Sequence, residues 1–215
     1  EPDLFVREWG RLPEGDGRSK AVKEAKAELG AQFGIDHVLK ATVYDNILAM
    51  RDSVFSNALA LDLLDGADTE VSHYWTVSHY WTEGVASWGV NCKARIDALP
   101  REDSMWNDCV VDIKTTANGS PEEFRRSCFN FSYHIQAQHY MTAAERGRFI
   151  FIVVERDAPH CVAIYELDDA ALTLARSELN RLLGLWAECE SENEWPSYPV
   201  EIQELSLPGW AYTQR

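Results

Sequence analysis

Residues 110–116 read Val-Val-Asp-Ile-Lys-Thr-Thr, and this stretch decides the fold that the sequence predicts. Its β-branched residues favour a strand, in which successive side chains alternate between two faces. Asp112 and Lys114 therefore share one face, opposite to that of the apolar residue between them. Residues 88–99 alternate in the same way and end their polar face at Asp97. Because one loop joins these two strands, we expect Asp97 and Asp112 to converge beside Lys114.

Two carboxylates beside one lysine indicate phosphate chemistry. Carboxylate oxygens are ligands that Mg²⁺ and Mn²⁺ prefer, and the ammonium group of Lys114 would face whatever the metal holds. Hydrolysis of a phosphodiester by metal-activated water uses such a set of groups. The alternative is that Asp97 and Asp112 are solvent-facing residues of a half-exposed sheet. Since Asp-x-Lys is a short and common string, the spacing alone leaves both interpretations open.

The composition indicates one globular domain whose contacts with nucleic acid are restricted. The chain has 215 residues, of which 46% are hydrophobic and 26% charged. No apolar run reaches the roughly eighteen residues that a membrane helix needs, and no signal peptide is recognisable. Five cysteines without a Cys-x-x-Cys pair indicate reduced thiols, as in a cytoplasmic protein. The net charge of −15 argues against indiscriminate coating of nucleic acid, so any DNA contact must be local.

Hydrophobic periodicity and turn residues predict the elements around these two strands. They are an amphipathic helix over 19–33, two helices within 37–64, a strand or hairpin over 70–82, a helix from Ser120 to about Arg146, strands over 149–154 and 161–167, a final helix capped by Asp168, and an extended tail over 197–210 packed on the body. This order predicts an α/β or α+β domain whose mixed central sheet is flanked by helices. Lys20, Lys23 and Lys26 of the first helix could contact phosphate, but a solvated helix face is the simpler interpretation.

The helix that begins at Ser120 carries further polar residues behind the Asp112 strand. Ser120 is placed as the N-cap, Pro121 occupies the first helical position, and Glu123 would complete a capping box. Further along, Gln136 and Tyr140 are four residues apart and share a face of the helix. Such a pair occurs by chance on many helices, but it gains weight when it follows an Asp-x-Lys strand.

Residues 71–82 contain the hexamer Val-Ser-His-Tyr-Trp-Thr twice in tandem. Its residues favour a strand, and an insertion of six residues, an even number, leaves the two faces of a strand unchanged. His73 and His79 could suggest a metal site. We interpret them as duplicated strand residues, because an exact short repeat is more simply explained by duplication than by selection of two ligands.

Four blocks of the sequence, taken together, resemble one known family. They are Cys-Lys-Ala-Arg-Ile-Asp at 92–97, Val-Asp-Ile-Lys-Thr-Thr-Ala at 111–117, the segment 133–140 with its Gln and Tyr, and Leu-Ser-Leu-Pro-Gly-Trp-Ala at 205–211. In this order they resemble the nuclease domains of the RecE (exodeoxyribonuclease VIII) family. That family belongs to the PD-(D/E)XK superfamily, in the RecB-like subgroup whose Gln-xxx-Tyr helix follows the Asp-x-Lys strand. The resemblance covers nearly the whole chain and is far more specific than Asp-x-Lys alone.

The resemblance implies a single PD-(D/E)XK nuclease domain over residues 1–215. It also implies an enzymatic activity, a partner protein and an oligomeric state. The expected enzyme is a Mg²⁺-dependent 5′-to-3′ exonuclease, with Mn²⁺ as a substitute, that degrades linear double-stranded DNA from its ends. It would serve homologous recombination of the phage or prophage type, beside a single-strand annealing protein. The family also implies a ring-shaped homo-oligomer, a tetramer, that encloses DNA.

The same resemblance assigns roles to individual residues. Asp97, Asp112 and the carbonyl of Ile113 would bind the metal, Lys114 would position the attacking water and stabilise charge, and Gln136 and Tyr140 would line the DNA-end pocket. The candidates for contacts with the DNA backbone are Lys93, Arg95, Thr115, Thr116, Arg125 and Arg126. A net acidic nuclease must gather its positive residues where the duplex runs, so their charge is expected to line one inner wall.

Two departures from the family pattern are visible. The family's first motif, a Gly-xxx-His on a helix, would fall upstream of Glu1, so we expect the chain to lack the segment that carries this metal-binding histidine. Glu70, at an acidic position of the family's strand, is the candidate substitute or neighbour in the metal site. The other departure is the tandem hexamer, which the family carries once.

Other classes of function compete with the exonuclease. The domain could be a catalytically inactive binding module on the same fold, or an acidic mimic of DNA, for which the charge of −15 would be suitable. A mimic would have no use for Lys114 between its acids. A site-specific endonuclease would need an element that reads bases in the major groove, and no basic recognition helix is evident.

Overall fold

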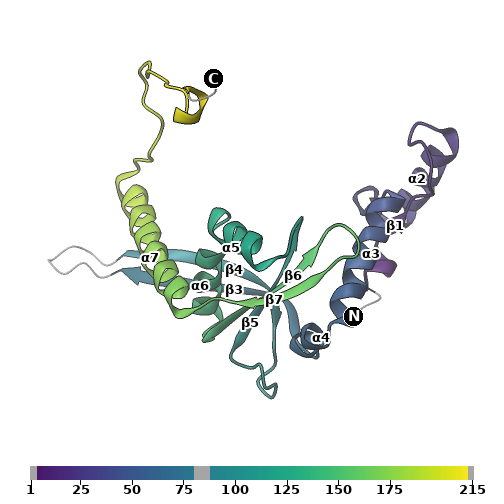
Figure 1. The fold of residues 1–215 in the computed structure, drawn as a ribbon, viewed down its shortest axis with the longest axis horizontal. Coiled ribbons are helices and arrows are strands. Elements are labelled where there is room, and N and C mark those ends of the chain that lie inside the picture. The colour runs from purple at the N-terminus through teal and green to yellow at the C-terminus, as the bar shows by residue number, and fades with distance from the viewer. Residues whose placement is uncertain (1–3, 80–87, 213–215) are drawn as a thin grey trace.

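A central five-stranded sheet separates two projecting parts of the molecule. The computed structural model describes residues 4–79 and 88–212. Figure 1 shows the N-terminal segment rising on one side of the sheet, and the last helix with the C-terminal tail rising on the other. Before the sheet come α1 (Leu4–Glu8), β1 (Gly10–Arg11), α2 (Lys20–Phe33), the 3₁₀ helix η1 (Ile35–His37), β2 (Val38–Leu39), α3 (Ala41–Ser56) and α4 (Ala58–Leu64).

The sheet is mixed, as the sequence predicts. Its strands are β3 (Asp68–His79), β4 (Trp88–Leu99), β5 (Cys109–Thr116), β6 (Arg148–Glu155) and β7 (Val162–Glu166), and they lie side by side in this order. Only β5 and β6 pair in parallel, while the other neighbours are antiparallel. The connection between β5 and β6 contains α5 (Pro121–Asn130) and α6 (Tyr133–Ala144), and α7 (Asp169–Glu192) follows β7.

Helices cover both faces of the sheet, because β6 is apolar on both sides. On one face Ile150 and Ile152 pack with residues of α3 and α4. On the other face Phe149 and Phe151 pack with residues of α5 and α6. Adjacent valines of β5 divide in the same way between these two apolar clusters. A strand buried on both faces reads as a continuous apolar run, which is the pattern of β6 in the sequence.

Residues 10–40, called the N-terminal arm below, form a small unit of their own. Strand β1 pairs in parallel with β2, and α2 packs beside them. The arm joins the sheet through α3, as Figure 1 shows. The helix predicted over 19–33 is confirmed, with Ser19 as its N-cap accepting a hydrogen bond from the backbone N–H of Val22. The short elements α1, β1 and β2 are not evident in the sequence, because two-residue strands carry no periodicity.

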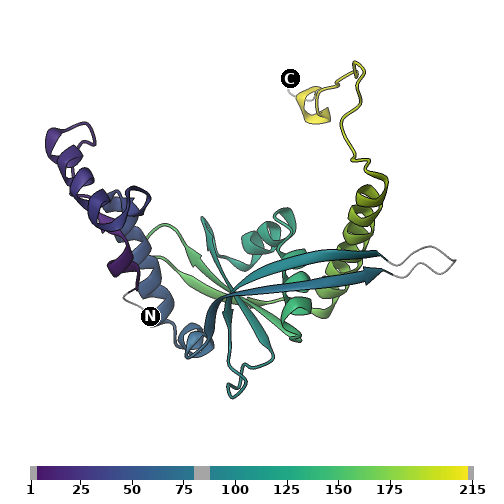
Figure 2. The same ribbon diagram turned by 180° about the vertical axis from the view of Figure 1, so that it is seen from behind.

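The strands β3 and β4 form a long ribbon that extends beyond the rest of the sheet (Figure 2). The side chains from Val71 to Ser78 alternate between half-buried and exposed, as an insertion of even length predicts. Trp75, on the half-buried face, contacts the ring of His139 on α6 with centroids 4.6 Å apart. The later residues of the second hexamer copy, 80–82, lie outside the described residues.

The single helix predicted from Ser120 to Arg146 is wrong, because the structure contains two helices. The break falls at Ser132, whose φ of 57° is left-handed, and the N–H of Phe131 closes the end of α5 by donating to Ser127. Hydrophobic spacing cannot reveal one left-handed residue between two helical segments. The predicted capping box is also wrong: the N–H of Ser120 donates to Asn118 (2.9 Å), which takes the place expected for the Glu123 carboxylate.

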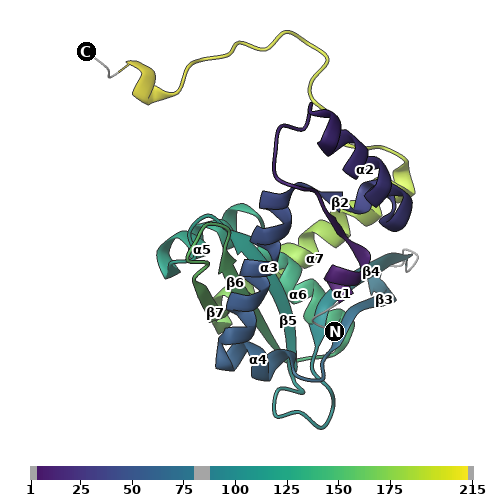
Figure 3. The same cartoon turned by 90° about the vertical axis from the view of Figure 1, so that its right-hand side faces the viewer.

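The C-terminal tail does not pack on the body, contrary to the prediction. Figure 3 shows the tail running away from the sheet and its helices. The side chains of Tyr198, Val200, Ile202 and Leu205 are almost completely exposed. Prolines in this segment lack an N–H donor and disfavour both helix and ladder, so the tail has little means of joining the sheet. Among the described residues no helix is long and apolar enough to cross a membrane.

Candidate active site

The strands β4 and β5 bring Asp97 and Asp112 together, as their spacing predicts. Their register contains one pair, Ala98 with Val111, so the two strands separate beyond it. There the backbone N–H of Ile113 donates to Asp97 Oδ2 at 2.8 Å, in place of a ladder bond to β4. The Asp97 carboxylate is thereby fixed against the backbone of the residue that follows Asp112.

Asp112, Lys114 and Gln136 form a closed ring of polar contacts. Lys114 Nζ lies 2.6 Å from Asp112 Oδ2 and donates to Gln136 Oε1 at 3.0 Å. Gln136 Nε2 donates to Asp112 Oδ1 at 3.1 Å. The amide of Gln136 can satisfy a lysine and a carboxylate at once only in this orientation, because its oxygen accepts and its nitrogen donates. Helix α6 therefore holds both charged groups of β5 in place.

Burial distinguishes this ring from a surface ion pair. Asp112 is only 1% exposed, and the Lys114 side chain is 16% exposed. The interpretation of Asp112 as a solvent-facing residue of a half-exposed sheet is therefore wrong. A buried charge pair is retained only with good geometry and further hydrogen bonds, which Gln136 supplies. The ring is thus a built polar site within an otherwise apolar layer.

Tyr133 is a fifth member of the site, and its residue type and spacing did not predict this role. Its ring centroid lies 4.6 Å from Lys114 Nζ, a cation–π contact. Tyr133 precedes Gln136 by three residues on α6, so the two side chains share a helix face. This spacing is the signal that could have identified it, but an aromatic residue near a helix start is ordinarily a core residue.

Burial raises the pKa of Asp112 to about 6, and the Asp97 carboxylate acts in the same direction. The Lys114 ammonium and the Gln136 amide act against this rise, but they do not outweigh the loss of hydration. The metal-free site therefore takes up a proton near pH 6. A bound divalent cation would favour the ionised carboxylate, because its charge opposes protonation.

The donor atoms of the site suit a hard divalent cation, but they are few. Asp112 Oδ2 is buried and, apart from its ion pair with Lys114, has no hydrogen-bond partner in the described chain. Together with Asp97 it offers the carboxylate oxygens that Mg²⁺ and Mn²⁺ prefer. The described residues contain no group of three or more His, Cys, Asp or Glu side chains that could hold a metal. Two carboxylates are therefore the protein's acidic donors here.

Glu70 lies opposite Asp97 in the β3–β4 ladder, but its carboxylate is engaged elsewhere. The register passes from Thr69–Ala98 to Val71–Ile96 without a pair at Glu70, whose φ is 56°. Its carboxylate forms an ion pair with Arg95 at 2.5 Å. The structure thus brings Glu70 to Arg95 and not into a three-acid group with Asp97 and Asp112, so its role as a metal ligand stays a prediction.

The other predicted residues have diverse surroundings. Tyr140 is half-buried in the apolar cluster between the sheet and α5–α6 and contacts Phe149, outside the polar ring.

Two of the cations predicted to contact DNA form ion pairs within the protein, Arg95 with Glu70 and Arg126 with two glutamates of its own helix. The remaining candidates are Lys93, Arg125 and Thr115, which are exposed, and Thr116, whose hydroxyl donates to the Asn118 carbonyl.

One solved structure shares this fold at a TM-score above 0.5. A putative exonuclease from Eubacterium rectale has a TM-score of 0.55 at 10% identity, and the match covers 99% of this chain and 76% of that chain. A phage-related exonuclease from Haemophilus somnus aligns over 89% of this chain and 95% of its own, at 11% identity and a TM-score of 0.40. No curated protein sequence matches this chain significantly.

A family model assigns the chain to a protein family, which solved structures of such low sequence identity cannot do. The model for the PDDEXK-like domain of unknown function (DUF3799) matches residues 13–206. The matched segment contains both strands of the site and the α6 helix. The expected PD-(D/E)XK fold is thereby confirmed, whereas the closer resemblance to RecE is not separately supported. Because the match spans most of the sequence, the chain belongs to the family of PDDEXK-like domains of unknown function, DUF3799.

Proposed function

We propose that this protein is a nuclease that hydrolyses the phosphodiester bonds of DNA at the Asp97–Asp112–Lys114 site. The observation that carries the proposal is the closed ring in which Gln136 binds both the buried Asp112 carboxylate and the Lys114 ammonium. Membership of the PDDEXK-like family and the fold shared with a putative exonuclease support a nuclease.

Each residue of the ring has a distinct task in this proposal. Lys114 presents a fixed positive charge, which stabilises negative charge on the phosphate and orients the attacking water. Gln136 and Tyr133 hold the ammonium group, so that little reorganisation is needed when the substrate arrives. Asp97 and Asp112 would hold Mg²⁺ or Mn²⁺, together with the Ile113 carbonyl and water. When bound, the cation supplies positive charge at the phosphate and lowers the pKa of water.

The finer features of the proposal rest on the resemblance to RecE. They are digestion of linear double-stranded DNA from its ends, 5′-to-3′ polarity, a ring-shaped tetramer, and a cytoplasmic role in phage-type recombination beside a single-strand annealing protein. Tyr140 would then contribute to the DNA-end pocket through its neighbour Gln136, and Glu70 would reach the metal only by leaving Arg95.

A catalytically inactive binding module on the same fold is the second candidate. It is favoured by one observation, the lack of a three-ligand metal group among the described residues. An acidic mimic of DNA is disfavoured, because a buried lysine between the acids reduces the negative potential that a mimic needs.

Digestion of linear and covalently closed circular duplex DNA, each with Mg²⁺ or EDTA, separates these candidates. We expect the linear DNA alone to be degraded, only with Mg²⁺, and we expect Asp112→Asn to abolish the activity. Asp103→Asn, in an exposed loop, is the matched control and should remain active. Cutting of closed circles would rule out an exonuclease, and activity that survives Asp112→Asn would remove this site from the mechanism. Binding without cleavage in every condition would favour the inactive module.

A further inference from the structure

Of the four cations that the sequence predicts to contact DNA, only two are free of ion pairs in the described chain. Arg95 and Arg126 are each neutralised by glutamates of the same protein. Lys93 and Arg125 remain exposed, in a chain of net charge −15. Stable binding to DNA depends on several Lys or Arg contacts with phosphates. A DNA-binding protein with this charge should therefore carry further unpaired cations elsewhere.

The N-terminal arm departs from the acidic character of the chain. Residues 10–40 contain six Lys or Arg residues and five Asp or Glu residues, a net charge of +1, whereas the whole chain carries −15. Several of these charges pair locally, Arg11 with Asp45, Arg18 with Asp16, and Lys20 with Glu24. Lys23, Lys26 and Lys40 form no ion pair with any residue that the structure describes. The positive charge of the arm is thus concentrated in three unpaired lysines.

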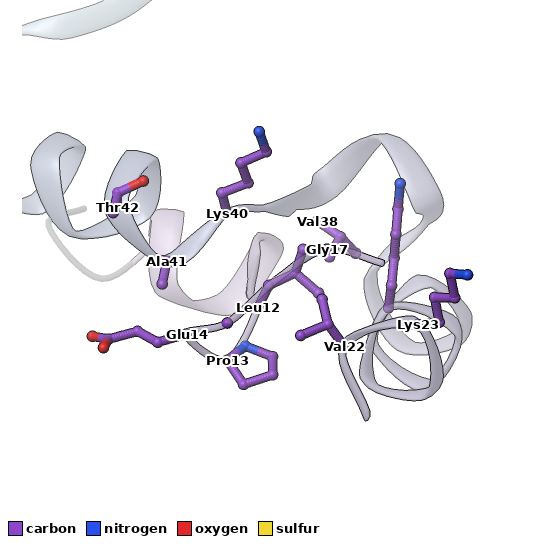
Figure 4. Close-up of a pocket in the computed structure, with 12 residues that line it drawn as sticks. Leu12, Pro13, Glu14, Gly17, Val22, Lys23, Val38, Lys40, Ala41 and Thr42 are labelled. Carbon is purple, nitrogen blue, oxygen red and sulfur yellow. The ribbon is translucent and has the colours of Figure 1, made fainter. Parts of the chain in front are cut away.

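These three lysines line one hollow of about 670 Å³, called the lysine hollow below, and Figure 4 labels Lys23 and Lys40 on its wall. Lys23 and Lys26 come from α2, one helical turn apart, and Lys40 immediately precedes α3. The apolar part of the wall consists of Leu12, Pro13, Val22 and Val38. Two segments that are fourteen residues or more apart in the sequence therefore contribute lysines to the wall of one cavity.

The remaining wall of the lysine hollow adds to the positive potential. Ala41 and Thr42, in the first turn of the sixteen-residue helix α3, line it, and the start of a helix carries partial positive charge. Glu14 is the only acid among the lining residues. Its carboxylate lies 3.6 Å from Arg11, and in Figure 4 it points away from Lys23 and Lys40.

We propose that the lysine hollow binds phosphates of the DNA backbone, so that the arm holds the substrate while β5 and α6 carry the chemistry. The proposal rests on the proposed nuclease function, because it takes DNA as the substrate. Ammonium groups act as point charges for phosphate, and the wall contains no aromatic ring on which a base could stack. Binding here is therefore independent of sequence, and the hollow is a holding site separate from the catalytic groups.

The salt dependence of DNA binding tests this assignment without any cleavage. The probe is a linear duplex oligonucleotide, followed by fluorescence anisotropy in EDTA between 50 and 200 mM NaCl, the range in which phosphate contacts are strongly screened. The triple variant Lys23→Gln, Lys26→Gln, Lys40→Gln keeps most of each side-chain stem and removes three charges. Three lost contacts should reduce the slope of log K against log salt by about 2.7 and weaken binding at least tenfold at low salt.

Lys20→Gln is the matched control, because Lys20 lies on the same helix but pairs with Glu24. Its salt slope should equal that of the wild-type protein, and thermal unfolding should show that both variants are folded. An unchanged slope in the triple variant overturns the lysine hollow and leaves the nuclease proposal intact. A reduced slope in a protein that never cleaves DNA supports the hollow and rejects the nuclease. Wild-type protein without salt-dependent DNA binding overturns both.

Discussion

Lysines occupy two contrasting regions of this molecule, the candidate active site and the lysine hollow. Lys114 is 16% exposed and is held by Asp112, Gln136 and the ring of Tyr133. Lys23 and Lys40, on the arm, are exposed and have no ion-pair partner in the described chain. Burying a charge costs several kcal/mol unless a partner compensates, whereas an exposed lysine loses almost no hydration. The sheet therefore fixes one lysine, which we propose for the chemistry, and the arm leaves the others exposed, which we propose for binding phosphate.

The largest expected difference between the two regions is in stability. Lys114→Met should destabilise the metal-free protein by about 4 kcal/mol at pH 8, because it leaves a buried carboxylate without its cation. DNA hydrolysis should also fall at least 100-fold, as when one charge-stabilising donor is removed. Urea unfolding in EDTA measures the first effect. Lys40→Met is the control and should change the free energy of unfolding by less than about 0.5 kcal/mol. Equal effects in the two variants would contradict the comparison.

A second difference concerns pH. The pKa of Asp112 rises from 3.8 to about 6 on folding, so the folded protein binds this proton more tightly than the unfolded chain. The resulting stabilisation is complete below pH 4 and is lost as the pH rises through 6, by on the order of 3 kcal/mol. Urea unfolding of the metal-free protein from pH 4 to pH 8 should show this loss in the wild type.

Asp112→Asn should remove that pH-dependent loss, whatever its effect on stability at any single pH. Asp103→Asn, on an exposed loop, should retain the wild-type profile. A profile for Asp112→Asn that still falls between pH 4 and pH 7 would assign the titration to another group. The lysine hollow contains no buried acid, so the triple variant should also keep the wild-type profile.

A smaller effect is expected from replacing Tyr133. Two substitutions separate the contribution of its aromatic ring from that of its hydroxyl group. Tyr133→Leu should lose about 1 kcal/mol of cation–π stabilisation of Lys114, equivalent to a roughly fivefold decrease in the rate of DNA hydrolysis. Tyr133→Phe keeps the ring and should retain the wild-type rate. If both variants lost activity equally, the hydroxyl and not the ring would be the functional group.

The parts of the fold that the sequence predicts well are those in which one periodicity dominates. The apolar run of β6 and the alternation of β4 and β5 specify their strands, because burial on two faces or one requires those patterns. The break between α5 and α6 depends on one left-handed residue, Ser132, and no spacing rule records it. The tail is apolar enough to suggest packing, but its side chains are exposed in the structure.

The candidate site was predictable to the extent that its residues lie in short motifs. Asp97, Asp112 and Lys114 share adjacent strands, and Gln136 follows in a recognisable order, so the structure brings together four residues that the sequence selects. Tyr133 was missed because aromatic residues are usually core residues. The lysines of α2 were interpreted as a solvated face, since their spacing gives no indication of Lys40 across the hollow.

The smallest expected effect is that of removing the tail, which is apolar like β6 but exposed. A chain that ends after Pro196 loses Val200, Ile202 and Leu205, whose side chains make almost no contact with the body. It retains the contact between Trp186 and Trp195, with ring centroids 5.0 Å apart. Urea unfolding at low protein concentration should therefore change by less than about 0.5 kcal/mol, whereas Phe151→Ala in the core should cost about 4 kcal/mol.

Protein concentration determines how a larger effect of this truncation should be interpreted. A loss that is independent of concentration would mean that the tail packs on its own body, as the sequence predicts and the structure contradicts. A loss that grows with concentration would mean that the tail of one copy packs on another, since association stabilises by mass action. Exposed apolar side chains in water are unfavourable, so the second outcome would give these residues a function in assembly and support the proposed ring.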